Sequence, residues 1–494
     1  MLWLFILGTV LELLLFLPGI WKLRKPIAAF SIAVTFGASL WIVYAYKNAG
    51  ALLILLTSIY RVINLMRLLE AKMHESYLHR VVLRSSLWLL GTQVILAGVW
   101  ALFAAQVISL GRNELLLIIA VLQLLCALLI LSFTVRNIRK SRYKPNDVFY
   151  SSQELPTITV GIPARNETDE LQRCIESVIA SDYPKLEILV LDDCSQDRTA
   201  EIIRSYAQSG VRFIHGSEPK ENWLAKNQAY DQLANEANGE FIVFMGADTQ
   251  VGIRTITSLV TLALNRKKRM LSVLPKRTDQ SISASIVQPM RYWWELALPR
   301  RLFNRPAVLS TLWMIERNTL QKAGGFEAVS RSVIPESYFA KQLVSKDAYG
   351  FVRSGGDLLV LTVKSFHDQF DRAIRYRYPE VHRRLELVLG LSLAETGLFL
   401  LPFVVFIVGL FIYIPAALVA AGACMLLIVA QYLILAATST ATAHFALINF
   451  ILAILMEIFV GNYSMYKYEF SEVDWKGRNI CIPVMHTVAH LLQE

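Results

Sequence analysis

The chain has 494 residues, of which 55% are hydrophobic and 18% are charged, and its mean hydropathy is +0.44. This composition is too apolar for an ordinary soluble protein and indicates several membrane spans. The formal net charge is +10, but the basic residues cluster beside apolar runs, as membrane-flanking residues do, so we expect no nucleic acid partner. The five cysteines form no CxxC pair, which excludes an obvious zinc site or disulfide framework.

Apolar stretches of about 20 residues have the length of a membrane-crossing helix, and five of them precede residue 145. They cover residues 1–20, 26–46, 49–65, 85–108 and 114–135. Basic residues follow the first, third and fifth stretches, whereas the other two turns are short and nearly neutral. We therefore expect a transmembrane region of about five helices over residues 1–145. By the positive-inside rule it places the next domain on the cytoplasmic side of the cell membrane.

The middle of the chain, residues 155–380, is more polar and alternates between two kinds of segment. Short apolar runs rich in β-branched residues predict strands at 158–163, 186–191, 211–215 and 241–245. Amphipathic patterns between them predict helices at 170–180, 199–208 and 225–237. This alternation indicates an α/β domain with a mostly parallel, Rossmann-like sheet covered by helices on both faces. Ligands of such sheets bind at the carboxyl ends of the strands.

Polar clusters follow three of the predicted strands. They are Pro163-Ala164-Arg165-Asn166-Glu167, Asp192-Asp193-Cys194-Ser195-Gln196-Asp197 and Gly246-Ala247-Asp248. Carboxylates at this edge can accept hydrogen bonds from a nucleobase N–H or from ribose hydroxyls. Asp248 is placed to hold a hard divalent ion together with phosphate oxygens. Helix capping remains an alternative for Ser195 and Asp197, and turn formation for Asp248.

Apolar stretches return after residue 385, near 390–412, 414–437 and 443–461. We expect a C-terminal transmembrane region over residues 386–465 and a polar tail over 466–494. Three full spans would leave the tail outside, whereas its basic residues favour the inside. Either all three stretches cross the membrane, or one of them is re-entrant or interfacial, so we expect two or three crossing helices.

In this order, the three polar clusters resemble the family 2 glycosyltransferases of the GT-A type, which show P-x-x-N-E, V-D-D-x-S-x-D-x-T and D-x-D. The resemblance covers about residues 155–380 and extends to the flanking membrane helices. Ceramide- and carotenoid-type glucosyltransferases resemble the chain most, and processive polysaccharide synthases more distantly. The resemblance implies a GT-A fold and a nucleotide-sugar site containing Pro163, Asn166, Glu167, Asp192, Asp193 and Asp248.

Three further elements extend the resemblance. Asn222–Asn227 is similar to a W-x-G-K-x-x-A element, which implies that Lys226 lies near the nucleotide-sugar. Arg372 and Arg375 match a Q/R-x-x-R-W motif, whose arginines contact the diphosphate or pack under the acceptor. Glu336 occupies the general-base position at the start of an E-D-x-x-L-A helix. Simpler alternatives are a solvated lysine, membrane-border arginines and an acid that meets a helix dipole.

Four positions depart from the family's pattern. Gly246 replaces the first aspartate of D-x-D, Ala225 the glycine of G-K, Pro335-Glu336 the usual E-D and Tyr376 the tryptophan. In the tail, Trp475-Lys476-Gly477-Arg478 is like the W-K-G-R endings of some membrane family 2 enzymes. The departures at the metal and base positions allow for a transferase of reduced or altered activity.

The resemblance implies an inverting, metal-dependent hexosyltransferase. A UDP-sugar would be the donor, a hydroxyl of a lipid-like molecule at the membrane the acceptor, and Mg²⁺ or Mn²⁺ at Asp248 the cofactor, with Glu336 as the catalytic base. A processive polysaccharide synthase is one alternative. A non-catalytic membrane protein with a degenerate transferase domain is the other.

Overall fold

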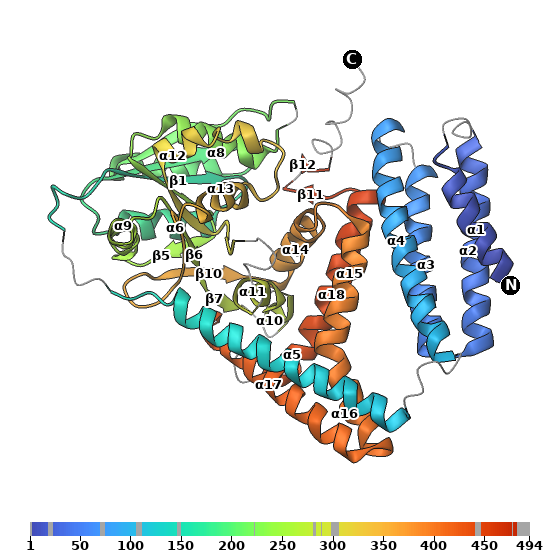
Figure 1. Cartoon of the computed structure of the whole chain (residues 1–494). Helices are drawn as coiled ribbons and strands as arrows, with labels where there is room; N and C mark the ends of the chain where they lie inside the picture. The colour runs from blue at the N-terminus through green and yellow to red at the C-terminus, as the bar shows by residue number, and fades with distance from the viewer. Residues whose placement is uncertain are drawn as a thin grey trace.

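The computed structural model consists of an α/β domain and long apolar helices that surround it in the sequence (Figure 1). It describes residues 2–17, 23–69, 75–104, 111–145, 150–221, 223–279, 283–287, 289–297, 306–439, 446–476 and 478–481. Asn222, Gly477, and parts of the predicted stretches 1–20, 85–108 and 443–461 and of the tail lie outside these residues.

Within this described part, seven helical runs are long and apolar enough to cross a membrane. They fall in α2 (Arg24–Tyr46), α3 (Ala49–Leu69), α4 (Glu75–Ala104), α5 (Arg112–Ser141), the run of α15 (Leu385–Glu395), η4 (Thr396–Leu400) and α16 (Leu401–Ile412), α17 (Ile414–Thr438) and α18 (Ala446–Phe470). Large apolar side chains on them are exposed, among them Val94 (70%), Leu122 (57%) and Phe411 (86%). Such continuous apolar surfaces belong to a membrane protein.

The first predicted stretch contains α1 (Leu2–Leu14), which has 13 residues and is shorter than a span. The count of five N-terminal spans therefore stays a prediction. Helices α1 to α4 form a bundle beside α15 and α18, while α5 lies alongside α17 (Figure 1). An ion pair between Arg67 and Glu469, 2.9 Å apart, links this bundle to the C-terminal helices.

The central sheet has seven strands in the order β3-β2-β1-β4-β8-β6-β9. These strands are β1 (Ile158–Ala164), β2 (Leu186–Asp192), β3 (Val211–His215), β4 (Phe241–Met245), β6 (Met270–Leu274), β8 (Leu312–Glu316) and β9 (Tyr349–Arg353). All neighbours are parallel except β8, which is antiparallel to both β4 and β6. The prediction of a mostly parallel sheet is confirmed. Because Ala164 pairs with Asp192, the loops after β1 and β2 emerge side by side.

Alternate residues of the strands enter two separate cores. One core lies against α6 (Asp169–Ile179), α7 (Thr199–Ser205) and α9 (Thr255–Asn265), and the other against α8 (Ala225–Glu236), α12 (Arg317–Lys322) and α13 (Pro335–Val344). In the second core, the rings of Phe244 and Trp313 are 4.6 Å apart and those of Tyr230 and Phe244 5.0 Å apart. This aromatic cluster fixes α8 on the sheet beside α13, whose first turn carries Glu336.

A smaller sheet and two short helices complete the domain. The sheet has the order β5 (Thr249–Val251), β10 (Val360–Lys364) and β7 (Lys276–Asp279), and the helices are α10 (Ala284–Val287) and α11 (Pro289–Leu296). Helix α14 (Phe366–Glu380) then packs against α18, where Arg377 and Glu457 pair at 2.7 Å. The α/β domain is thus held directly against a membrane helix.

Candidate active site

A pocket of about 660 Å³ lies at the carboxyl edge of the central sheet. This volume lies within the range of small-molecule binding sites. Eight of the ten predicted site residues line it, namely Pro163, Asn166, Glu167, Asp193, Lys226, Asp248, Arg372 and Arg375. They come from the ends of β1, β2 and β4, from α8 and from α14. Asp192 and Glu336 are not part of the lining.

Asn166 and Asp192 tie the loops after β1 and β2 together. The Asn166 backbone N–H donates to Ser195 Oγ at 3.0 Å, and its side-chain oxygen accepts from the Gln196 N–H at 2.9 Å. Asp192 is 3% exposed and accepts from the Ser195 N–H at 3.2 Å. Asn166 also has a left-handed backbone with φ 47°, a conformation that asparagine tolerates. Both side chains therefore position the loops, and direct contact with a donor stays a prediction.

The two carboxylates that face the pocket from these loops are each paired with a cation of the C-terminal tail. Arg478 Nη1 lies 2.8 Å from both oxygens of Asp193, and Lys476 pairs with Glu167. Burial raises the pKa of the Asp193 carboxyl above its usual value, and Arg478 opposes that rise. The sequence pattern does not predict Lys476 and Arg478 as site residues, because a basic tail next to apolar helices indicates membrane topology. The W-K-G-R resemblance was the signal that could have identified them.

Asp248 stands at the turn between β4 and β5, and its Oδ1 lies 3.4 Å from Thr249 Oγ1. A Cβ atom at Gly246, the place of the family's first aspartate, would lie 2.9 Å from Asp248 Oδ1. No group of three His, Cys, Asp or Glu side chains able to hold a metal ion occurs among the described residues. A single carboxylate fits an ion that also binds donor phosphates, as Mg²⁺ does in many sites, but does not form a complete metal cage.

Lys226 reaches across the pocket toward α14. Its Nζ lies 3.4 Å from Tyr376 Oη and 5.2 Å from the centroid of the Tyr230 ring. Burial, the largest effect, would lower the pKa of Lys226, but Tyr230, Tyr376 and Glu336 together raise it. Arg372 donates to Ser310 Oγ at 3.0 Å and lies 5.7 Å from the centroid of the Tyr376 ring. Two cations that line the pocket, Lys226 and Arg372, therefore both lie close to Tyr376.

Glu336 stands in the first turn of α13 after Pro335 and interacts electrostatically with Lys226 and Tyr376. Its side chain is fully buried, and neither carboxylate oxygen has a hydrogen-bond partner among the described residues. The helix N-terminus favours a negative charge there. An acid placed only to meet a helix dipole would normally lie in water, so its burial beside Lys226 and Tyr376 is not explained by that role.

The Tyr376 hydroxyl should have a pKa well below that of an ordinary tyrosine. Burial raises its pKa, but Lys226, Arg372 and Arg375 together lower it from 10.0 to about 8. Because the folded pKa is the lower one, the phenolate adds stability that grows as the pH rises from about 8 toward 10 and is absent below that window. The absorbance difference at 295 nm between wild type and Tyr376→Phe should show a midpoint near pH 8. Exposed Tyr338 provides the matched control Tyr338→Phe, and a midpoint at pH 10 for Tyr376 would contradict the expectation.

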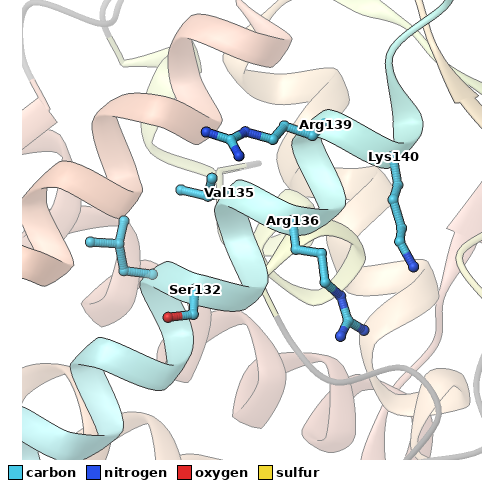
Figure 2. A pocket seen from close by; sticks show the side chains of 6 residues that line it. Ser132, Val135, Arg136, Arg139 and Lys140 are labelled. Atoms are coloured by element: carbon cyan, nitrogen blue, oxygen red, sulfur yellow. The ribbon is translucent and has the colours of Figure 1, made fainter.

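A second hollow, of about 440 Å³, lies on the last turns of α5 (Figure 2). Leu131, Ser132 and Val135 line it together with the cations Arg136, Arg139 and Lys140. Arg136 and Lys140 extend to one side of the helix and Arg139 to the other, so the three charges do not converge on one point (Figure 2). This arrangement matches a helix end at a membrane border better than a site for a single anion.

Comparison with known proteins identifies the domain that carries the pocket. Residues 159–323 match the family model described as glycosyl transferase family 2. An uncharacterized glycosyltransferase of Escherichia coli, YibD, is 31% identical over 109 residues, which cover 22% of this chain and 30% of the relative. A 4,4'-diaponeurosporenoate glycosyltransferase of Staphylococcus aureus is 28% identical over 178 residues, which cover 35% and 44%. The chain thus spans less than half the length of these two curated relatives.

Among solved structures, the mannosyltransferase PcManGT from Pyrobaculum calidifontis, in complex with GDP-Man and Mn²⁺, has 19% identity and a TM-score of 0.44. The alignment covers 69% of this chain and 99% of that one. The family match and the named relatives agree with the resemblance found in the sequence: the chain contains a glycosyl transferase family 2 domain over residues 159–323.

Proposed function

We propose that this chain transfers one hexose, with inversion, from a UDP-sugar to a hydroxyl group of a lipid-like acceptor at the membrane. The observation that carries the proposal is the composition and place of the pocket. Strand-end acids and three cations suited to a diphosphate line one pocket, on a domain that packs against membrane helix α18. The buried Glu336 carboxylate does not line this pocket but interacts electrostatically with Lys226 and Tyr376, which do. The similarity to a diaponeurosporenoate glycosyltransferase supports a lipid-like acceptor.

The proposed reaction is a single in-line displacement at the anomeric carbon. The acceptor oxygen forms the new bond, the bond to the diphosphate breaks, and Glu336 takes the acceptor proton. Lys226, Arg372 and Arg375 line the pocket and would stabilise the departing diphosphate. A Mg²⁺ or Mn²⁺ ion held by Asp248 would neutralise further charge on that diphosphate when bound. Asp193 would accept a hydrogen bond from the uracil N–H.

The positions of the basic residues support a cytoplasmic catalytic domain. Arg136, Arg139 and Lys140 are exposed at the end of α5, immediately before the α/β domain. Cytoplasmic flanks carry such residues, and nucleotide-sugars are cytosolic.

The test uses membranes that contain the full chain, incubated with radiolabelled UDP-glucose, UDP-galactose or GDP-mannose and then extracted with organic solvent. We expect one UDP-sugar to label a lipid-soluble product that carries a single sugar. The initial rate of labelling should exceed that of membranes with the Glu336→Gln variant by about a thousandfold. A labelled polymer would support the processive synthase instead. Absence of both labelling and UDP binding would reject the enzyme.

A further inference from the structure

A short hairpin follows the last membrane helix and lies against the donor pocket. Its strands are β11 (Asp474–Trp475) and β12 (Arg478–Asn479), in which Trp475 pairs with Arg478. In Figure 1 the hairpin is seen beside α14 and the α/β domain. Val473, Trp475 and Lys476 contribute to the pocket lining. The function proposed above assigns no role to this segment.

The base of the hairpin is anchored to the membrane-proximal core. Val473 and Cys481 are each 3% exposed and belong to the cluster that includes Tyr378 of α14 and Tyr468 of α18. The Ile480 N–H donates to the Val473 carbonyl at 2.9 Å and closes the hairpin. Because both of its ends are buried, the hairpin stands as a fixed wall of the pocket.

The tip of the hairpin binds the two loops that contain the strand-end acids. Lys476 Nζ donates to the Arg165 carbonyl at 2.6 Å and pairs with Glu167, and Arg165 Nε donates back to the Lys476 carbonyl at 3.2 Å. Arg478 lies 2.8 Å from Asp193 and 3.1 Å from Glu218. The side chains of Arg478 and Asp193 are only 14% and 6% exposed, so solvent screens this pair weakly.

We propose that the hairpin is a nucleobase-selecting wall of the donor site, in which Arg478 is a positioning residue that holds Asp193 in its acceptor form. The proposal rests on the proposed function. A carboxylate has about four lone-pair sites, and Arg478 Nη1 occupies only one on each oxygen, which leaves room for a nucleobase N–H. Without Arg478, the buried Asp193 would gain a proton more readily and donate instead of accept.

The hairpin does not fill the donor site. With the hairpin in place, the pocket still measures about 660 Å³, which is within the range that encloses ligands of nucleotide-sugar size. An occupied site is therefore compatible with both ion pairs. This geometry favours a wall that selects the base over a plug that must leave before the donor enters.

The test measures UDP and CDP binding to the full-length protein in detergent or nanodiscs by titration calorimetry. Wild type should prefer UDP, since uracil N3 carries a proton and cytosine N3 does not. Arg478→Gln should weaken UDP binding about tenfold and reduce the preference over CDP, because a hydrogen bond to a charged group is lost. Arg478→Lys should restore much of both, because a single guanidinium nitrogen makes both contacts to Asp193.

The matched control is Glu218→Gln, which removes the exposed partner of Arg478 and keeps Asp193, and it should bind UDP like wild type. If Arg478→Gln does not fold, Lys476→Gln serves as the second variant and should also weaken UDP binding. If the variant that folds, Arg478→Gln or Lys476→Gln, binds UDP as tightly as wild type or more tightly, the proposal is overturned. Tighter binding would indicate that the hairpin is a plug that competes with the donor. A wild type that binds no nucleoside diphosphate would overturn the proposed function and this inference with it.

Discussion

Replacing Glu336 with glutamine should lower the rate of sugar transfer about a thousandfold while UDP binding stays within a few-fold of wild type. A positioned general base typically contributes a factor of about 10² to 10⁴. Glutamine keeps the size of the side chain and removes its ability to accept the acceptor proton. The rate of label transfer in purified membranes measures the first effect, and UDP titration measures the second.

The same variant should be at least as stable as wild type. Glu336 is fully buried, and neither of its oxygens has a hydrogen-bond partner in the described part of the chain. A buried carboxylate without such partners costs folding free energy and a neutral amide costs less, which offsets the loss of the negative charge that stabilises protonated Lys226. An unchanged or raised Tm together with lost transfer would show that the carboxylate serves the reaction and not the fold.

Two further variants test whether transfer depends on the Glu336 carboxylate itself and on its position. Glu327→Gln, on an exposed glutamate of the same region, should leave transfer unchanged. Glu336→Asp restores the family's usual residue but withdraws the carboxylate by about 1.5 Å in this backbone, so transfer should fall by about ten- to a hundredfold. Transfer by Glu336→Gln within threefold of wild type would show that the base is a different group.

The first half of the α/β domain could be predicted because three of its four strands, β1, β2 and β4, are buried on both faces, whereas the edge strand β3 is mostly half-buried or exposed. Strands β1 to β4 lie within about one residue of the predicted positions, since Val160, Val190 and Val243 enter one core while Leu189 and Phe244 enter the other. Continuous apolar runs of this kind are typical of central parallel strands. The antiparallel insertion of β8 between β4 and β6 was not predictable, because periodicity identifies a strand and not its distant partner.

In the candidate site, too, the sequence pattern identifies local elements but not their distant partners. The strand-end loops were predictable because parallel strands bring their carboxyl ends to one edge. The Asp193–Arg478 pair joins residues 285 positions apart, and no local pattern of charge or hydropathy indicates that contact. The burial of Glu336 was equally hidden, since a Pro-Glu pair at a helix start normally predicts an exposed first turn.

Asp248 should be needed for metal binding, and the metal should bind only together with the nucleotide. With one carboxylate at the D-x-D position and no described cluster of three ligating side chains, the protein alone offers too few oxygen ligands. The diphosphate supplies the missing ones. Titration of Mn²⁺ should therefore show binding in the presence of UDP and little in its absence. Binding of Mn²⁺ without nucleotide at micromolar concentration would contradict this.

Asp248→Asn should abolish the UDP-dependent binding of Mn²⁺ and lower transfer by about a hundredfold or more, because the diphosphate then leaves without full charge neutralisation. Exposed Asp357, whose carboxylate lies 3.9 Å from Arg254, provides the control Asp357→Asn, which should behave like wild type. Chelation should reduce wild-type transfer to the level of the Asp248→Asn variant, and added Mn²⁺ should restore it.

The glycine in place of the first D-x-D aspartate makes this prediction specific to the chain. Gly246→Asp recreates the family's motif, yet its Cβ would lie 2.9 Å from Asp248 Oδ1, a distance that forces one side chain to move. We therefore expect Gly246→Asp to lower transfer and not to strengthen metal binding. Improved Mn²⁺ affinity in that variant would mean that the Asp248 carboxylate can rotate away from the new Cβ and still bind the ion together with the added carboxylate.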